Sequence, residues 1–340
     1  MLKTLSEAFG ASGAEQEVRD YIKNAVESIC DDVYTDNMGN LICFKKGKLK
    51  GGRSIMLSAH MDEVGFIISG INEKGYLNFK TIGGIDPRVV IAKRVLIGKN
   101  KIRGVIGDKP PHLTDKNNNA ALKTEELFID IGAKNKQEAG EYVSIGDYAC
   151  FDSKFIQFGN GLVKGKALDN RIGCYILTEL AKNNYPHDIF YVFTVQEEVG
   201  CRGAQTAAYK IKPDISIVVE GTTCSDVPKT DETGFSTRLR GGPALSIVDR
   251  TSYSDKELRN ALYKAAIGNN IKIQYKQTTL GGNDAGAIQL SEAGVKTAVI
   301  SVPCRYIHSP SSVASLEDIS ACREVLHNFL ISEDKEKWSF

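Results

Sequence analysis

The sequence has no uninterrupted run of about 18 apolar residues, the length that a membrane-spanning helix requires. Its opening residues, 1–10, also lack the basic start and apolar run that are typical of a secretory signal peptide. The sequence therefore predicts neither membrane insertion nor secretion, and we expect a cytoplasmic protein.

There is also no excess of charge of either sign. The 43 lysines and arginines nearly balance the 42 aspartates and glutamates, so the formal net charge is only +1. Nucleic acids and anionic membrane surfaces attract proteins largely through an excess of positive charge. We therefore expect neither a nucleic acid nor a membrane among the partners.

Motifs of several other classes of protein are missing. The eight cysteines include no C-x-x-C pair, which disfavours a disulfide framework and predicts reduced, buried thiols. The G-x-S-x-G elbow of serine hydrolases is absent, and we interpret the positions of Cys201 and Cys304 near histidines as coincidence. The sequence shows neither a fixed-period repeat nor a low-complexity tract, which argues against solenoids and disordered scaffolds. The nucleophile of any hydrolysis is expected to be water.

The length and the hydrophobic pattern indicate a large α/β fold. A chain of 340 residues is about twice the usual size of one domain. Ser12 and Glu15 have the spacing of a helix capping box, and apolar residues follow at helical spacing up to Val26. Residues 54–59 and 64–69 are typical of buried strands.

The middle of the chain has a different texture. From residue 70 to residue 161, short β-like runs at 95–97, 127–131 and 147–151 are separated by Gly, Asn, Lys and Pro. We therefore predict a small all-β domain at 70–161, inserted into a catalytic α/β domain formed by 1–69 and 162–340.

After residue 165 the pattern alternates between helix and strand. A helix is expected at 172–182, strands at 189–195, 215–219 and 297–302, and a closing helix from Ser315 with Asp318 in its first turn. This alternation predicts a mostly parallel sheet that is flanked by helices on both faces.

The candidate ligands of a metal ion follow this strand pattern. His60 ends the first predicted strand, Glu198 follows the strand at 189–195, Glu220 ends the strand at 215–219, and His308 follows the last strand by a short loop. Open α/β sheets place their ligands at the carboxyl ends of strands. Asp169 precedes the helix at 172–182, and one carboxylate with two oxygens can bridge two cations. Two imidazoles and three carboxylates form a mixed nitrogen and oxygen set that suits Zn, Co or Mn.

Two further acidic residues adjoin this set. Asp62 stands two residues after His60, and this spacing in extended chain sends both side chains to one side. Glu197 and Glu198 are adjacent and therefore point to opposite sides, so one can bind metal while the other transfers protons.

Taken in order, these motifs resemble one family. The resemblance is to the tetrahedral aminopeptidases, the glutamyl aminopeptidase group whose members are sometimes labelled cellulase or endoglucanase. It covers essentially the whole chain, including the opening Ser-Gly-Ala-Glu and the inserted β domain. The motifs that carry it are His60-Met61-Asp62-Glu63-Val64-Gly65, Ala167-Leu168-Asp169-Asn170-Arg171, Glu197-Glu198-Val199-Gly200, Gly281-Gly282-Asn283-Asp284-Ala285-Gly286 and Arg305-Tyr306-Ile307-His308-Ser309.

The resemblance implies a role for each of these residues. His60, Asp169 and Glu220 would hold one divalent ion, while Asp169, Glu198 and His308 would hold a second. Glu197 would be the general base that takes a proton from the bridging water and passes it to the leaving amine, and Asp62 would orient His60. Family members most often have Asp where this sequence has Glu220, so the geometry of that metal site is expected to differ. Gly282, Asn283 and Asp284 would either contact the substrate or organise their loop.

The resemblance also implies the fold, activity and assembly. The fold would be that of co-catalytic zinc peptidases with an inserted PDZ-like domain, and the activity would be the removal of N-terminal residues from short peptides. Subunits would assemble through the inserted domain into a homo-oligomer, as far as a hollow tetrahedral dodecamer.

Three alternatives stay open at the level of sequence. A deacylase or carboxypeptidase could use the same di-metal core to cleave another amide bond. A metal-binding protein could have lost its activity, although the presence of Glu197 argues against that. Glycoside hydrolysis, which the family's other label suggests, would need a suitably spaced pair of carboxylic acids and no metal.

Overall fold

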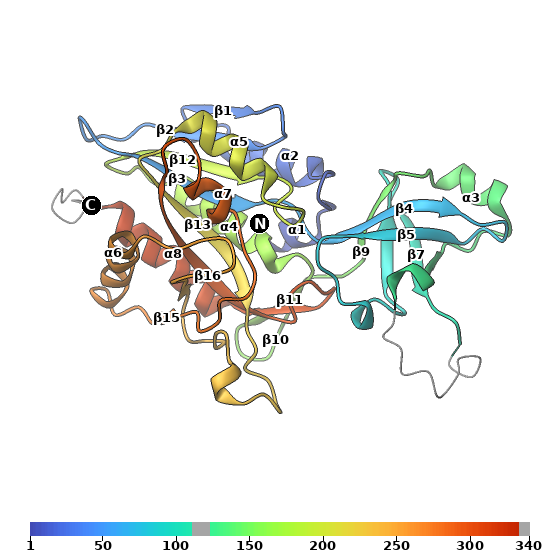
Figure 1. The fold of residues 1–340 in the computed structure, drawn as a ribbon. Helices are drawn as coiled ribbons and strands as arrows, with labels where there is room; N and C mark the ends of the chain where they lie inside the picture. The colour runs from blue at the N-terminus through green and yellow to red at the C-terminus, as the bar shows by residue number, and fades with distance from the viewer. Residues whose placement is uncertain (111–122, 333–340) are drawn as a thin grey trace.

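The computed structural model describes residues 1–110 and 123–332. It contains a large mixed sheet covered by helices and a small closed barrel beside it (Figure 1). No helix within the described residues is long and apolar enough to cross a membrane. All eight cysteines are free thiols; Cys30 and Cys201 are partly exposed and the other six are buried.

Along its main path, the large sheet is parallel only at its centre, and the short pair β14–β15 off this path is also parallel. Its strand order is β1-β2-β12-β3-β13-β16-β17-β11-β10, and the three pairings among β12, β3, β13 and β16 are parallel. The outer pairings are antiparallel. The predicted mostly parallel sheet is therefore a mixed one. The strands are β1 (Asp32–Thr35), β2 (Leu41–Lys45), β3 (Ser54–His60), β10 (Ile156–Phe158), β11 (Leu162–Gly165), β12 (Asp188–Thr194), β13 (Ile215–Thr223), β16 (Lys296–Arg305) and β17 (Ser312–Ser315), with β14 (Ala244–Leu245) and β15 (Gln274–Tyr275) off the main path.

Alternating side chains of the central strands supply two separate cores. In β3, Ile55 and Leu57 belong to the larger core, whereas Met56 between them belongs to the core on the opposite face. This follows from the twofold alternation of side chains along a strand. Helices therefore cover both faces (Figure 1). The larger core packs α1 (Leu2–Glu7), α2 (Gln16–Val26), α4 (Leu168–Ala181), α6 (Lys256–Ile267) and α8 (Leu316–Leu330), and the other packs α5 (Arg202–Ile211) and α7 (Ala285–Gln289).

The barrel has its own core. Its order is β4-β5-β8-β7-β6-β9, every pairing is antiparallel, and the buried side chains include Phe66, Phe79 and Phe151. Barrel pairing runs from Gly65 to Phe151, whereas the change in sequence texture suggested limits of 70 and 161. The sequence pattern reflects where turn-forming residues stand, and these positions need not coincide with the first and last paired residues of the barrel strands. The elements are β4 (Gly65–Ile71), β5 (Leu77–Ile82), β6 (Arg94–Ile97), β7 (Ile102–Gly107), β8 (Phe128–Asp130), β9 (Tyr148–Phe151) and the helix α3 (Lys136–Tyr142), with short 3₁₀ turns at Pro87–Val89, Thr124–Glu126 and, outside the barrel, Glu232–Gly234.

The two predicted helix starts have different outcomes. Ser315 caps α8 as expected, because its hydroxyl accepts a hydrogen bond from the backbone N–H of Glu317 at 3.2 Å. The capping box predicted for Ser12 and Glu15 is wrong. Helix α2 begins at Gln16, the hydroxyl of Ser12 donates to Asp62, and the carboxylate of Glu15 accepts from Gly13 and Gln196.

A buried ion network joins the amino-terminal segment to the start of the barrel. The carboxylate of Glu63, whose side chain is 3% exposed, accepts hydrogen bonds from Lys166 and Arg171. Lys166 also donates to the carbonyl of Ala8 at 2.8 Å, and Arg171 donates to that of Met61 at 2.7 Å. Both cations therefore share the single negative charge of Glu63 and also donate to backbone carbonyls.

We expect Glu63→Gln to destabilise the fold by about 3–5 kcal/mol, because it leaves two buried cations without their counter-charge. Urea or guanidinium unfolding measures the loss. The matched control is Glu73→Gln, because Glu73 pairs at 2.9 Å with Lys136 on the surface, where the side chains are 85% and 56% exposed. An exposed pair contributes at most about 1 kcal/mol. Equal unfolding midpoints for the two variants would show that the buried network adds nothing.

Candidate metal centre

The predicted ligands meet at one edge of the large sheet. His60 is the last residue of β3, Glu198 follows β12, Glu220 lies in β13, and His308 follows β16. These four strands are neighbours and parallel, so their carboxyl ends lie side by side. Asp169, in the first turn of α4, lies close to both histidines.

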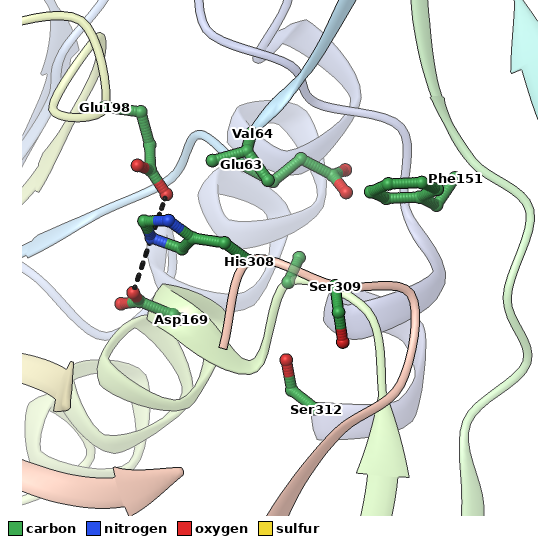
Figure 2. Close-up of a pocket in the computed structure, with 9 residues that line it drawn as sticks. Glu63, Val64, Phe151, Asp169, Glu198, His308, Ser309 and Ser312 are labelled. Atoms are coloured by element: carbon green, nitrogen blue, oxygen red, sulfur yellow. Dashed lines mark ion pairs between the residues drawn. The ribbon is translucent and has the colours of Figure 1, made fainter. Parts of the chain in front are cut away.

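Two groups of three ligands share Asp169. In the first, Nε2 of His60 lies 3.2 Å from Oε1 of Glu220 and 3.5 Å from Oδ1 of Asp169. In the second, Nε2 of His308 lies 3.4 Å from Oε1 of Glu198 and 3.5 Å from Oδ2 of Asp169, as Figure 2 shows. Within each group the candidate ligand atoms lie within 4.8 Å of one another, close enough to hold a metal ion. Asp169 presents one oxygen to each group.

The carboxylates carry oxygens that are suited to a cation. Oδ1 of Asp169, Oε1 of Glu198 and Oε2 of Glu220 are buried and have no hydrogen-bond partner within residues 1–110 and 123–332. Buried polar atoms in native proteins almost always have a partner, and carboxylate oxygens are good ligands of divalent ions. The residues present therefore fit metal ions.

The electrostatics agree with this fit. Burial raises the pKa of Glu220 to about 8 and that of Glu198 to about 7, with repulsion from Asp169 adding to both. Burial opposes protonation of His308, but Asp169 and Glu198 outweigh it and raise the pKa of His308 to about 9. Unless it is neutralised by bound cations, this much buried negative charge retains protons.

Backbone carbonyls orient both imidazoles. Nδ1 of His308 donates to the carbonyl of Gly84 at 2.8 Å, and Nδ1 of His60 donates to the carbonyl of Asp62 at 3.1 Å. A carbonyl can only accept, so Nδ1 carries a hydrogen and Nε2 faces the carboxylates, where it can bind a metal ion once it has lost its own proton. Nδ1 of His60 is thus closer to the carbonyl oxygen of Asp62 than to its carboxylate, which lies 3.4 Å away. The predicted orienting role of Asp62 would act through that carboxylate.

The carboxylate of Asp62 mainly holds the turn after β12. Its Oδ1 accepts from the N–H of Glu197 at 3.0 Å, and its Oδ2 accepts from that of Glu198 at 3.1 Å and from the hydroxyl of Ser12 at 2.6 Å. Burial alone would raise the pKa of Asp62, but these hydrogen bonds and His60 lower it below its usual range. Asp62 therefore stays ionised and fixes the backbone that carries both glutamates.

Glu197 lies beside the two ligand groups. Its Oε2 is 3.9 Å from Nε2 of His60, and the thiol of Cys201 is 3.7 Å from its Oε1. Burial raises the pKa of Glu197 well above its usual range, and the charges of Glu198 and Glu220 add to the effect. A carboxylate with raised proton affinity suits proton transfer near neutral pH.

The predicted substrate loop is held by its own hydrogen bonds. Asn283 donates to Asp249 at 2.9 Å and accepts from the N–H of Ala285 at 2.9 Å. A side chain at Gly282 would approach within 2.6 Å of Thr251. Asp284 accepts from Thr194 at 2.6 Å through Oδ2. These contacts account for loop organisation, and any contact with a substrate stays a prediction.

Both parts of the fold border the site. A small hollow is lined by Asp169, Glu198 and His308 and also by Val64 and Phe151 at the base of the barrel (Figure 2). The carbonyl of Gly84 comes from the segment that follows β5. Sequence reasoning missed Gly84 because no motif marks a backbone carbonyl as a partner of a distant histidine.

The comparisons with known proteins agree on one family. The family model for M42 glutamyl aminopeptidase matches residues 39–325. A candidate aminopeptidase of Acetivibrio thermocellus is 39% identical over 328 residues, 96% of each chain. The glutamyl aminopeptidase of Lactococcus lactis is 32% identical, covering 99% of this chain and 96% of that protein. The lysyl aminopeptidase of Pyrococcus furiosus is 31% identical, covering 94% of this chain and 92% of that protein.

Solved structures give the same result. The TET aminopeptidase of a marine sediment archaeon, Thaumarchaeota archaeon SCGC AB-539-E09, superimposes with a TM-score of 0.95 at 35% identity, covering 99% of this chain and 97% of that one. The TET1 peptidase of Pyrococcus horikoshii, described as assembling into a tetrahedron or a large octahedral shell, gives 0.87 at 32% identity, covering 97% and 98%.

We expect the binding of divalent zinc to release protons near pH 7. The pKa of Glu220 is about 8 and that of His308 is about 9, so both groups hold a proton there. A metal ligand must lose its proton, and the release should diminish as the pH rises above about 9. Calorimetric titration in two buffers of different ionisation enthalpy counts the protons.

Glu220→Gln is the variant that tests this assignment. It removes a titrating group and an anionic ligand, so both the protons released and the ions bound per chain should fall. Glu257→Gln, on the surface with a side chain that is 59% exposed, is the matched control. Unchanged ion stoichiometry and proton release in Glu220→Gln would remove Glu220 from the ligands.

Proposed function

This chain belongs to the M42 glutamyl aminopeptidase family, and on that basis we propose that it removes N-terminal residues from short peptides by metal-dependent hydrolysis. Family membership makes it a hydrolase that acts on peptides. The observation that supports the mechanism is the pair of ligand groups that share Asp169, with Glu197 beside them.

Two divalent ions, Zn, Co or Mn, are proposed as cofactors. His60, Asp169 and Glu220 would hold one ion, and Asp169, Glu198 and His308 the other. When bound, such a pair polarises the scissile carbonyl and acidifies water. The main structural support is that, within the described residues, buried carboxylate oxygens without a hydrogen-bond partner belong to these same groups.

Proton transfer is assigned to Glu197. Its carboxylate removes a proton from the attacking water and delivers it to the leaving amine. The raised pKa of Glu197 supports both halves of this task, because a weakly acidic carboxyl accepts a proton readily and still releases it to an amine. Asp62 holds the backbone N–H of Glu197 and thereby positions it.

The loop Gly282-Asn283-Asp284 is proposed to border the substrate. Its support is that candidate ligand atoms of Asp284, Glu197 and Cys201 lie within 4.8 Å of one another. Asp284 is fully buried, and burial raises its pKa to about 6.

A substrate panel tests the proposed activity. The metal-replete protein should cleave aminoacyl p-nitroanilides and lose this activity on chelation. N-acetylated versions of the same substrates should resist, because an aminopeptidase needs the free amine. Glu197→Gln should lower kcat by about 10²- to 10⁴-fold, the usual contribution of a general base, with the same ions bound per chain.

Other outcomes of the panel select other functions. Preferential cleavage of N-acylated substrates would indicate a deacylase or carboxypeptidase. Cellulose cleavage that survives chelation would indicate a glycosidase. A Glu197→Gln variant as active as the parent protein would contradict the assignment of the base.

The barrel is proposed to be a PDZ-like domain inserted into the catalytic domain. The sequence pattern predicts the inserted domain at 70–161 and the catalytic domain at 1–69 and 162–340. The inserted domain is proposed to join subunits into a cytoplasmic homo-oligomer. The barrel's separate core supports a domain of its own, and Val64, Phe66 and Ile68 in that core extend it to residues before 70. The main support for the proposed assembly is the likeness of this chain to the TET1 peptidase, one structure of which is described as a dodecamer.

Light scattering of the metal-replete protein tests this assembly. A dodecamer should give twelve times the mass of one chain. A mass equal to that of a single chain, unchanged on raising the protein concentration, would contradict the proposed oligomer.

A further inference from the structure

The segment between α1 and α2 makes two buried contacts with the site that the mechanism above does not use. The hydroxyl of Ser12 donates to Oδ2 of Asp62 at 2.6 Å, and Oε1 of Glu15 accepts from the N–H groups of Gly13 at 2.7 Å and Gln196 at 3.2 Å. Ser12 and Glu15 are both 5% exposed. The segment is anchored by its own backbone, because the carbonyl of Gly10 accepts from the N–H of Glu63 at 2.9 Å.

In the turn after β12, side chains accept the backbone N–H groups, whereas the carbonyls of residues 195–197 accept from backbone N–H groups of residues 200–203. Four consecutive backbone N–H groups, those of residues 195–198, donate to side chains. The first donates to Asn40, the second to Glu15, and the last two to the carboxylate of Asp62. Leaving a buried backbone N–H without an acceptor costs about 1–3 kcal/mol. The conformation of this turn therefore depends on acceptors that come from three distant parts of the chain.

One residue of the turn is in an unfavourable conformation. Gln196 has φ of 57°, in the left-handed region where side chains other than glycine are uncommon. Glu15 accepts the N–H of this residue, immediately before the proposed base Glu197. Burial raises the pKa of Glu15, so placing a carboxylate here has a cost that the hydrogen bonds must offset.

We propose that Ser12 and Glu15 are positioning residues for Glu197: Glu15 holds the turn directly, and Ser12 holds it through Asp62. This inference rests on the proposed role of Glu197 as the base. The two residues touch neither the candidate ligand groups nor the hollow beside them, and they act through the backbone that carries Glu197.

Paired substitutions test the proposal. Glu15→Ala and Ser12→Ala each remove an acceptor or donor, and each should lower kcat by about 10- to 100-fold, the effect of displacing a reacting group by up to about 1 Å. KM and the number of bound ions should stay unchanged in Glu15→Ala, because Glu15 accepts from Gln196 and not from the proposed ligand Glu198. Glu15→Gln retains a carbonyl acceptor and Ser12→Thr retains the hydroxyl, so both should recover most of the lost rate. Glu17→Ala is the matched control. Glu17 lies on α2, where its half-exposed side chain pairs with Lys101.

A readout that does not depend on activity accompanies the kinetics. Amide hydrogen exchange of the peptide spanning 194–201 should accelerate in Glu15→Ala and Ser12→Ala and remain at the parent rate in Glu17→Ala. If Glu15→Ala fails to fold, Ser12→Ala, which loses a single hydrogen bond, carries the same comparison.

The outcomes separate this inference from the proposed function. Unchanged exchange and unchanged kcat in both alanine variants would overturn the positioning role. So would a parallel loss of kcat, bound metal and unfolding midpoint that the Gln and Thr variants do not restore, because it would indicate a purely structural role. If the alanine variants exchange faster but the unsubstituted protein has no aminopeptidase activity, Ser12 and Glu15 do restrain the turn, and it is the proposed function that is refuted.

Discussion

Mutual repulsion among buried carboxylates is the constraint on which this structure depends. Asp169, Glu197, Glu198, Glu220 and Asp284 lie together at the carboxyl edge of four parallel strands, and burial raises the pKa of four of them. A folded chain tolerates such a cluster only where protons or cations neutralise it and the surrounding backbone cannot move apart. Asn40, Glu15 and Asp62, which accept hydrogen bonds from the backbone N–H groups of residues 195–198, supply part of that restraint.

The sequence predicted the parts of the fold that carry a periodic or ordered signal. Strand β3 was found from its continuous apolar run, and the cap of α8 from Ser315. The candidate ligands were found because their motifs stand at strand ends in a fixed order, and the structure places them in two groups around Asp169. Their individual roles are still proposals.

The remainder depended on contacts that leave no local pattern. The spacing of Ser12 and Glu15 is the same whether they cap a helix or reach across the core, and only the position of Asp62 and Gln196 in space distinguishes the two. The antiparallel edges of the sheet and the true start of the barrel at Gly65 were likewise missed, because hydrogen-bond partners are chosen by topology rather than by residue type.

The hydrogen bond from His308 to the carbonyl of Gly84 has a consequence for how such proteins can be recombined. Because the segment after β5 supplies the acceptor that selects one tautomer of a distant imidazole, the barrel region is not an interchangeable attachment. A chimaera that exchanged this region between homologues would have to reproduce the path of its backbone beside His308, or the exchanged part would alter the candidate metal centre.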